Sequence, residues 1–278
     1  MSLRAGVDEV RPSLPDGFSL GLVLARGLVL LAWNFLSFLG MALVISLPAA
    51  AITVLLTMVL PEPKISIQID NGFHLQSSPA ESAAFVLVCL LGLLTFLAVQ
   101  TAVTHRTFGS MSGRRAGFGA CLLRAFAALP SLAGAALVLV VTLGVIWGGR
   151  AYLMLSIFRA TFSSTWMEFA GVVAALPPIF LAVVWSVFLP ALVVERAGPI
   201  GCFARSWTLT KGRRWSILIL LLLFSALEYG LSYVLQFSLV MLGTQVPLSF
   251  LGAAMLTTAY YHLRVEHDGP ASVARVFD

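Results

Sequence analysis

The sequence predicts an all-α integral membrane protein, because it is rich in apolar residues, contains long apolar segments and distributes its positive charges unevenly. Of 278 residues, 59% are hydrophobic and 10% are charged, and the mean hydropathy is +0.98. A soluble domain usually carries about 25% charged residues. A chain this poor in charge cannot cover a water-soluble core, whereas a bilayer solvates apolar side chains directly. We therefore expect about six transmembrane helices in three pairs, with amphipathic helices along the cytoplasmic surface.

Six apolar segments are long enough to cross a bilayer, which takes about 20 residues in a helix. We place the spans at about 35–60, 82–104, 130–152, 169–194, 215–237 and 239–263. They belong to a transmembrane domain of residues 18–264, which lies between a tail of residues 1–17 and a tail of residues 265–278. The first tail mixes charged residues with prolines, so we do not expect a cleavable signal sequence.

The first apolar segment, Phe18–Leu60, is about twice as long as a span requires. The polar pair Trp33 and Asn34 divides it. We expect residues 18–33 to lie along the cytoplasmic interface, with Arg26 reaching lipid headgroups, and residues 35–60 to cross. The alternative is two closely connected spans, which would add a seventh crossing and require a very short turn at Asn34. We prefer six crossings.

The positive charges predict an orientation in the membrane. Of the 17 Lys and Arg residues, 14 fall on the side of the termini and only three fall on the opposite side, namely Lys64, Arg150 and Arg159. Positively charged segments next to spans are retained in the cytoplasm. We therefore expect both termini to be cytoplasmic.

The first external segment, residues 61–81, has the pattern of a β-hairpin. Polar and apolar residues alternate from Lys64 to Asp70, and the pair Asn71-Gly72, typical of a two-residue type I′ turn, follows. We expect a short hairpin or an ordered loop here. A second external segment, Ser156 to Glu168, carries aromatic residues at helical spacing, and we expect it to lie on the outer interface.

Three cytoplasmic segments resemble one another, since each begins with a glycine and an apolar residue and leads through an arginine into a span. They are Gly17–Arg26, Gly117–Arg124 and Gly198–Arg205. We interpret them as a repeated unit, an interfacial helix followed by two spans. All three units enter from the same side, so they are parallel repeats, unlike the inverted repeats of many transporters.

Residues 190–214 carry the most information about function. Pro199 suits the first turn of a helix and Gly212 suits its end. The expected apolar face of this helix consists of Ile200, Phe203, Ala204 and Trp207. The candidate residues for contact with lipid or with a partner are the basic and aromatic side chains of this segment: Arg205, Trp207, Lys211, Arg213 and Arg214.

Two interpretations of these positive charges remain open. They can fix the topology and attract anionic lipid headgroups without specificity, each contributing about 1 kcal/mol near the surface. They can also form a docking surface for a particular headgroup or for another membrane protein complex. We expect partners of these kinds on the cytoplasmic side, and no nucleic acid.

Two motifs carry a resemblance to a known family. The first is Val194-Glu195-Arg196-x-Gly198-Pro199, continued by Arg205-Ser206-Trp207-x-Leu209-Thr210-Lys211-Gly212, and the second is Tyr260-Tyr-His-Leu-Arg264-x-Glu266. With these motifs the chain resembles the bacterial glycerophosphoryl diester phosphodiesterase membrane-domain family, the YciC-like inner-membrane proteins, over nearly its whole length. The resemblance implies a multi-pass protein of the bacterial inner (cytoplasmic) membrane. It does not imply phosphodiesterase activity, because we expect no catalytic barrel in this chain.

The sequence contains no spacing typical of a metal or cofactor site. The cysteines, Cys89, Cys121 and Cys202, are far apart, and the four histidines have no metal-ligand spacing. A phosphate-binding GxxxxGK[ST] loop is absent as well. We therefore expect neither an enzyme nor a cofactor-binding protein.

Glu228 is the most conspicuous polar residue within a predicted span, because it lies near the middle of the fifth one. A charged residue facing lipid at that depth costs about 2.5–3.5 kcal/mol on the insertion scale. Glu228 must therefore face a partner group, face water or be protonated, and Arg150 is a possible ion-pair partner. A structural contact, a transport or proton role, and a contact to another subunit all remain open.

The function that the sequence favours is that of a non-catalytic accessory, structural or assembly protein of the inner membrane. Such a protein associates with lipid or with a larger membrane complex through its basic cytoplasmic helices. The alternative is a small transporter, channel or lipid-handling protein that uses Glu228 within the bundle.

Overall fold

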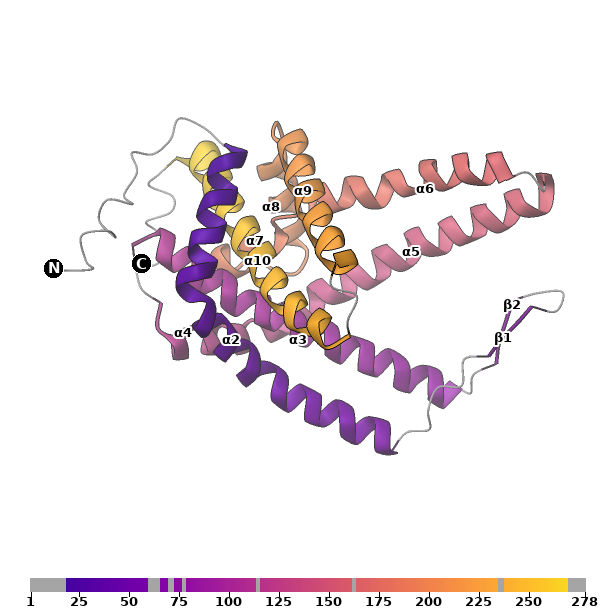
Figure 1. Cartoon of the computed structure of the whole chain (residues 1–278), viewed down its shortest axis with the longest axis horizontal. Helices are drawn as coiled ribbons and strands as arrows, with labels where there is room; N and C mark the ends of the chain where they lie inside the picture. Colours follow the sequence, from indigo (N-terminus) through magenta and orange to yellow (C-terminus); the bar gives the residue numbers. More distant parts are fainter. Residues whose placement is uncertain are drawn as a thin grey trace.

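The computed structural model describes residues 19–59, 66–69, 73–76, 79–113, 116–161, 164–234 and 238–269 (Figure 1). Over this part the chain is helical apart from one β-hairpin. Its elements are α2 Leu20–Val59, β1 Ser66–Ile69, β2 Phe73–Gln76, α3 Pro79–Met111, α4 Phe118–Ala127, α5 Leu129–Thr161, α6 Ser164–Val184, α7 Phe188–Glu195, α8 Gly201–Thr210, α9 Arg214–Val234 and α10 Ser238–Asp268. The tail of residues 1–17 and residues 270–278 lie outside the described residues.

Five segments of the described chain are helical, long and apolar enough to cross a membrane. They are Leu20–Leu56, Ala83–Met111, Leu129–Leu153, Gly171–Glu195 and Arg214–Leu231. The prediction of a helical, multi-pass membrane protein is confirmed at this level. The sixth expected span lies in α10, which is not among these five, so the sixth crossing stays a prediction, as does the side on which the termini lie.

Helix α2 is continuous over 40 residues, where we expected an interfacial helix and a separate span. Asn34 does not break it, because its Nδ2 donates to the carbonyl of Leu30 at 3.0 Å and its Oδ1 accepts from Nε of Arg106 at 3.0 Å. With both ends of the amide bonded, asparagine can stay inside a helix. The turn that two closely connected spans would need at Asn34 is therefore not formed.

Buried apolar side chains from every described helix form the core, and within it α2, α3 and α10 pack most extensively against one another (Figure 1). Nε2 of Gln100 lies 3.4 Å from the carbonyl oxygen of Ser249, and the hydroxyls of Thr257 and Thr104 are 3.3 Å apart. Since both residue numbers rise together, α3 and α10 run in the same direction. Further buried threonines line this contact, and small hydroxyl side chains of this kind hold helices together in membranes.

Helix α2 runs opposite to α10. Nη1 of Arg26 lies 3.0 Å from Nε2 of His262, and the rings of Phe38 and Phe250 meet edge to face with centroids 5.9 Å apart. One residue number falls as the other rises, so the pair is antiparallel. Arg26, which we expected to reach lipid headgroups, is instead half-buried against α10.

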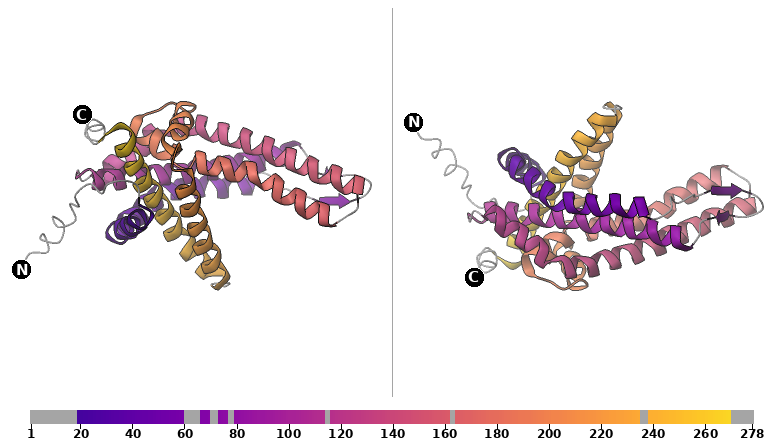
Figure 2. Two further views of the ribbon diagram at one scale, coloured as in Figure 1. Left: turned by 90° about the horizontal axis from the view of Figure 1, so that it is seen from above. Right: turned by 90° about the horizontal axis from the view of Figure 1, so that it is seen from below.

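Two helical hairpins leave the core in different directions (Figure 2). Helices α5 and α6 lie side by side and extend towards the end of the molecule where β1 and β2 lie, whereas α9 and α10 turn away from them. The start of α2 and the end of α10 lie at the opposite end (Figure 1). We call the surface formed by Glu195–Trp215 and Tyr260–Gly269 the basic end.

The expected β-hairpin is present, with β1 and β2 antiparallel and Ile69 paired with Phe73. The two-residue turn that we expected at Asn71-Gly72 lies outside the described residues. The side chains of the second external segment, Ser156 to Glu168, lie mostly outside the described residues; the helices α5 and α6 meet within it.

Two of the three repeated segments form the short helices α4 and α8, each of ten residues and each placed just before a long helix. The remaining repeated segment, Gly17–Arg26, leads into the long helix α2, which begins at Leu20. In α4, Nη2 of Arg124 donates to the carbonyl of Val193 at 2.6 Å. This contact attaches α4 to α7, so the arginine of the second repeat is directed into the protein.

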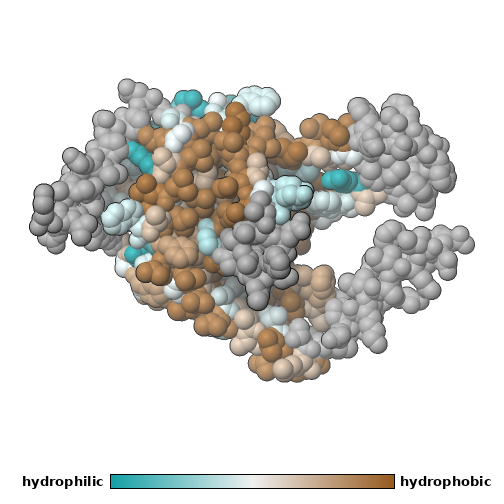
Figure 3. Space-filling model, in the orientation of Figure 1, coloured by the Kyte–Doolittle hydropathy of each residue, from teal (hydrophilic) through white to brown (hydrophobic). Residues whose placement is uncertain are grey.

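Apolar side chains cover much of the exposed surface (Figure 3). Soluble monomers rarely expose contiguous apolar patches of this extent. Large apolar residues are exposed along α2, α5, α6 and α9 alike. The distribution suits helices that face lipid, and it agrees with the multi-pass assignment.

Candidate functional site

A short loop joins α7 to α8 at the basic end. Arg196 ends α7 with φ of 54°, a left-handed conformation that is uncommon for residues other than glycine. Pro199 then packs against α5 so closely that a Cβ built at Gly134 would lie 2.8 Å from the Cβ of Pro199. The absence of a side chain at Gly134 of α5 therefore allows the close approach of Pro199, which leads into α8.

The apolar stripe predicted for α8 is only partly buried in the protein. Phe203 is buried, whereas Ile200 is 74% exposed and Trp207 is 43% exposed. The polar Ser206 faces inward, where its hydroxyl donates to the carbonyl of Val184 at 2.7 Å. On the face that α8 turns to the protein, buried hydroxyls with hydrogen bonds therefore take the place of some apolar side chains. The buried residues are Cys202, Phe203, Ser206, Leu209 and Thr210.

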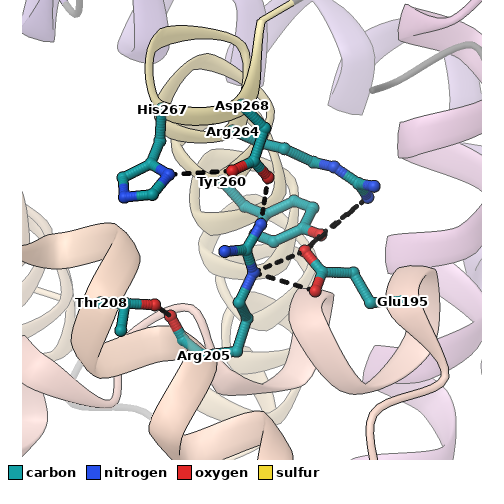
Figure 4. Close-up of polar contacts among 7 residues, drawn as sticks. All are labelled: Glu195, Arg205, Thr208, Tyr260, Arg264, His267 and Asp268. Atoms are coloured by element: carbon teal, nitrogen blue, oxygen red, sulfur yellow. Dashed lines mark hydrogen bonds and ion pairs between the residues drawn. The ribbon is translucent and has the colours of Figure 1, made fainter. Parts of the chain in front are cut away.

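Arg205 is the centre of a network of charged groups (Figure 4). Its Nε lies 2.9 and 3.1 Å from the two carboxylate oxygens of Glu195 at the end of α7, and its Nη2 donates to Oδ2 of Asp268 at the end of α10. We expected Arg205 to contact lipid or a partner. Instead its planar guanidinium, which carries five N–H donors, connects α7, α8 and α10.

Glu195 is held from α10 as well (Figure 4). The hydroxyl of Tyr260, which is fully buried, donates to Oε1 of Glu195 at 2.7 Å. Nη1 of Arg264 donates to the same hydroxyl at 3.1 Å and lies 3.8 Å from Oε1 of Glu195. A carboxylate removed from water needs such partners, since its burial otherwise costs several kcal/mol. The network is therefore a structural connection between three helices.

An ion pair and a further polar contact flank this network. Nη2 and Nε of Arg213 donate to Oε1 of Glu266 at 2.6 and 3.1 Å. Nδ1 of His267 lies 2.8 Å from Oδ1 of Asp268. Arg213, another candidate contact residue, thus uses part of its hydrogen-bonding capacity on a carboxylate of α10.

Arg214 is held by aromatic rings. Its Cζ lies 4.7 Å from the ring centroid of Trp207 and 5.5 Å from that of Phe180, distances typical of cation–π contacts. The next residue, Trp215, is 80% exposed. Trp207 and Trp215 therefore present indole rings at the surface of the basic end, as tryptophans at membrane interfaces do.

The charges of this network shift the pKa values of its members. Burial lowers the pKa of Arg205, but the hydrogen bond and charge of Glu195, together with Asp268, outweigh it and raise the pKa overall. Burial raises the pKa of Asp268, but its hydrogen bond to His267 and the charge of Arg205 lower it overall. Both shifts favour the charged forms that make the ion pairs.

A cleft of about 270 Å³ opens between the α8–α9 turn and the end of α10. Its floor is apolar, formed by the buried side chains of Leu209 and Leu263. Lys211 is exposed at its edge, and no ion pair involves Lys211 within the described residues. The other residues that line the cleft are Lys211, Gly212, Arg213, Glu266 and His267.

Glu228 and Arg150 are not brought together. Arg150 lies over the ring of Trp147 on its own helix, with Cζ 5.1 Å from the ring centroid. Glu228 is partly exposed on α9 beside Tyr229, which is 76% exposed. The ion pair that we considered for these two residues is not formed among the described contacts.

The described residues contain no group of three or more His, Cys, Asp or Glu side chains that could hold a metal ion. Cys121 and Cys202 are buried, and Cys89 is exposed on α3. Burial raises the pKa of Cys202 to about 11, so its thiol stays protonated and packs as a small apolar group.

Sequence reasoning missed the acidic half of the site, namely Glu195, Glu266 and Asp268, and with it Tyr260. The signal was present in the sequence, because the chain has only 12 Asp and Glu residues, and Glu195 precedes Arg196 while Glu266 and Asp268 closely follow Arg264. In a chain so poor in charge, acidic residues beside basic segments are candidates for internal ion pairs.

Comparison with known proteins gives no match for this chain, whether with family models, with curated proteins or with solved structures.

Proposed function

We propose that this chain is a non-catalytic accessory protein of the bacterial inner membrane that associates with anionic lipid headgroups through its basic end. In this proposal the chain crosses the membrane six times, with α10 as the sixth span, and both termini and the basic end face the cytoplasm. The excess of positive charge beside the spans supports that orientation.

One observation supports the proposal: some positive charges of the basic end form ion pairs within the protein, whereas others are exposed. Arg205 and Arg213 pair with carboxylates of α7 and α10, whereas Lys211 is exposed, and Trp207 and Trp215 expose their rings. An exposed cation beside exposed indoles suits the level of phospholipid headgroups. In this proposal the ion-paired arginines stabilise the conformation of this surface, and the exposed lysine and indole rings contact the lipid headgroups.

Membership in the glycerophosphoryl diester phosphodiesterase membrane-domain family is part of the proposal. Glu195 of the first motif and Tyr260 of the second are 65 positions apart, yet Glu195 contacts both Tyr260 and Arg264 of the second motif. A shared three-dimensional role for both motifs supports a common family pattern. No observation favours the transporter alternative through Glu228, so we do not propose it.

The test is purification of the tagged chain from native membranes in mild detergent, followed by mass spectrometry of the lipids and proteins that accompany it. We expect anionic phospholipids to be enriched over the bulk membrane. A Lys211→Glu, Trp215→Ala variant should lose the enrichment, and Tyr152→Ala, an equally exposed position on α5, should keep it. Co-purified lipid of bulk composition would contradict the proposal.

A further inference from the structure

We infer that the cleft between the α8–α9 turn and the end of α10 is a binding site for one phosphate group, such as the phosphate of a phospholipid headgroup. The inference rests on the proposed function, because it names the group that the basic end recognises and the place where it binds. The cleft measures about 270 Å³, below the roughly 300–1,000 Å³ typical of drug-sized ligands, so it suits a small polar group.

Arg213 supplies donors in a fixed orientation. Its Nε and one terminal nitrogen, Nη2, both point to Oε1 of Glu266. A guanidinium has five N–H donors, so the donors of the other terminal nitrogen remain for a second anion. Glu266 therefore positions Arg213 without using all of it, and an arginine held in this way binds phosphate oxygens well.

Lys211 supplies the second cation. It lines the cleft and is exposed, and within the described chain no carboxylate forms an ion pair with it. The other lining groups of α10 are the ion-paired Glu266 and His267, whose Nδ1 faces Asp268. Lys211 is therefore the positive charge of the cleft that is available to an incoming anion.

The backbone of the turn adds a third donor. The N–H groups of Lys211 and Arg213 donate to the carbonyls of Thr208 and Thr210, whereas no hydrogen bond from the N–H of Gly212 occurs in the part of the chain that the structure describes. Gly212 lines the cleft with φ of +91°, a conformation that favours glycine. Backbone N–H groups in such turns are common donors to phosphate oxygens.

The apolar surroundings point to a lipid as the source of the phosphate. Leu209 and Leu263 form an apolar floor under the charged rim, and Trp215, two residues after Arg213, is 80% exposed. A phosphodiester with attached glycerol and acyl chains would place its charge on the rim and its apolar part along the exposed tryptophan. A free phosphate would use the rim alone.

The experiment uses the full chain in detergent, with native mass spectrometry to count bound phosphatidylglycerol and phosphatidylcholine, and calorimetry with inorganic phosphate. We compare Lys211→Ala with Arg196→Gly, which removes a positive charge from the same end but outside the cleft and suits the left-handed backbone at 196. Lys211→Arg is the rescue variant. Since one charge contributes about 1 kcal/mol at a lipid surface, Lys211→Ala should weaken binding about fivefold.

A single bound phosphatidylglycerol that is weakened by Lys211→Ala, kept by Arg196→Gly and restored by Lys211→Arg supports the inference with a lipid as the source. Binding of inorganic phosphate with the same variant pattern supports it with a soluble phosphate as the source. Equal weakening by both variants, or by neither, overturns the cleft as a site. If the unmodified chain also prefers no anionic lipid over phosphatidylcholine, the proposed function fails with it.

Discussion

Tyr260 and Glu195 lie 65 positions apart in the sequence, and a hydrogen bond of 2.7 Å joins the tyrosine hydroxyl to Oε1 of the carboxylate. The bond ties the last turns of α10 to the end of α7. Through Glu195 it also reaches Arg205 on α8, whose Nε lies 2.9 Å from Oε2. The geometry of the basic end therefore depends on contacts among three helices rather than on any one of them.

Replacing Tyr260 by phenylalanine should destabilise the protein. The hydroxyl is buried, donates to Glu195 and accepts from Arg264, so its loss leaves charged groups with fewer partners. We expect a loss of about 1–3 kcal/mol in the free energy of unfolding, measured by chemical unfolding in detergent. Tyr261→Phe, one position along α10, is the control and should change stability little, because its hydroxyl makes no hydrogen bond within the described chain. Equal effects of both substitutions would contradict this role of Tyr260.

Glu195 and Arg205 should show energetic coupling. A double-mutant cycle with Glu195→Gln and Arg205→Gln removes each charge alone and then both together. Residues that share one network couple by about 0.5–3 kcal/mol, and their side chains here are only 19% and 25% exposed. We expect the double variant to lose less stability than the sum of the single ones. Strict additivity would show that the ion pair makes no energetic contribution.

The contact of Asp268 with Arg205 should depend on pH. The pKa of Asp268 is lowered in the folded protein, so its contribution to stability is present above the ordinary carboxyl value of 3.8 and is lost as the pH falls through the folded value. The difference in melting temperature between the unmodified chain and Asp268→Asn should therefore shrink as the pH is lowered below 3.8. A difference that stays constant across this range would contradict the ion pair.

Gly134 should not tolerate a methyl group. An added Cβ would lie 2.8 Å from Cβ of Pro199, and such overpacking costs about 1–3 kcal/mol. Gly144 on the same helix is the matched control, because an added Cβ there meets nothing within 4 Å. Alanine is favoured over glycine in helices by about 1 kcal/mol. Gly134→Ala should lower the melting temperature and Gly144→Ala should not, and a rise for both would contradict the close contact at Pro199.

The parts of the fold that sequence predicted well depend on local composition. The apolar helices and the pairing of β1 with β2 follow from hydropathy and from the alternation of side chains. The continuity of α2 could not be predicted, because it depends on Arg106 of another helix, which bonds the amide of Asn34. A polar residue within an apolar segment marks a break only when no distant partner satisfies it.

The candidate site shows the same limit. Basic residues at the end of a span predict contact with headgroups, and Lys211 with the exposed Trp215 still fits that prediction. Arg205 does not, because its partners Glu195 and Asp268 come from α7 and from the end of α10. Periodicity places a side chain on a face of its own helix but does not say which other helix covers that face.

The central claim, that the basic end faces the cytoplasm, is tested most directly by cysteine labelling from each side of the membrane. In a chain with its native cysteines replaced by alanine, single cysteines are introduced by Lys211→Cys and, in the segment of residues 61–81, by Ser77→Cys. Membrane-impermeant maleimide is then applied to right-side-out and inside-out vesicles. Position 211 should be labelled from the cytoplasmic side and position 77 from the opposite side. Labelling of position 211 from the external side, or of both positions from one side, would contradict the claim.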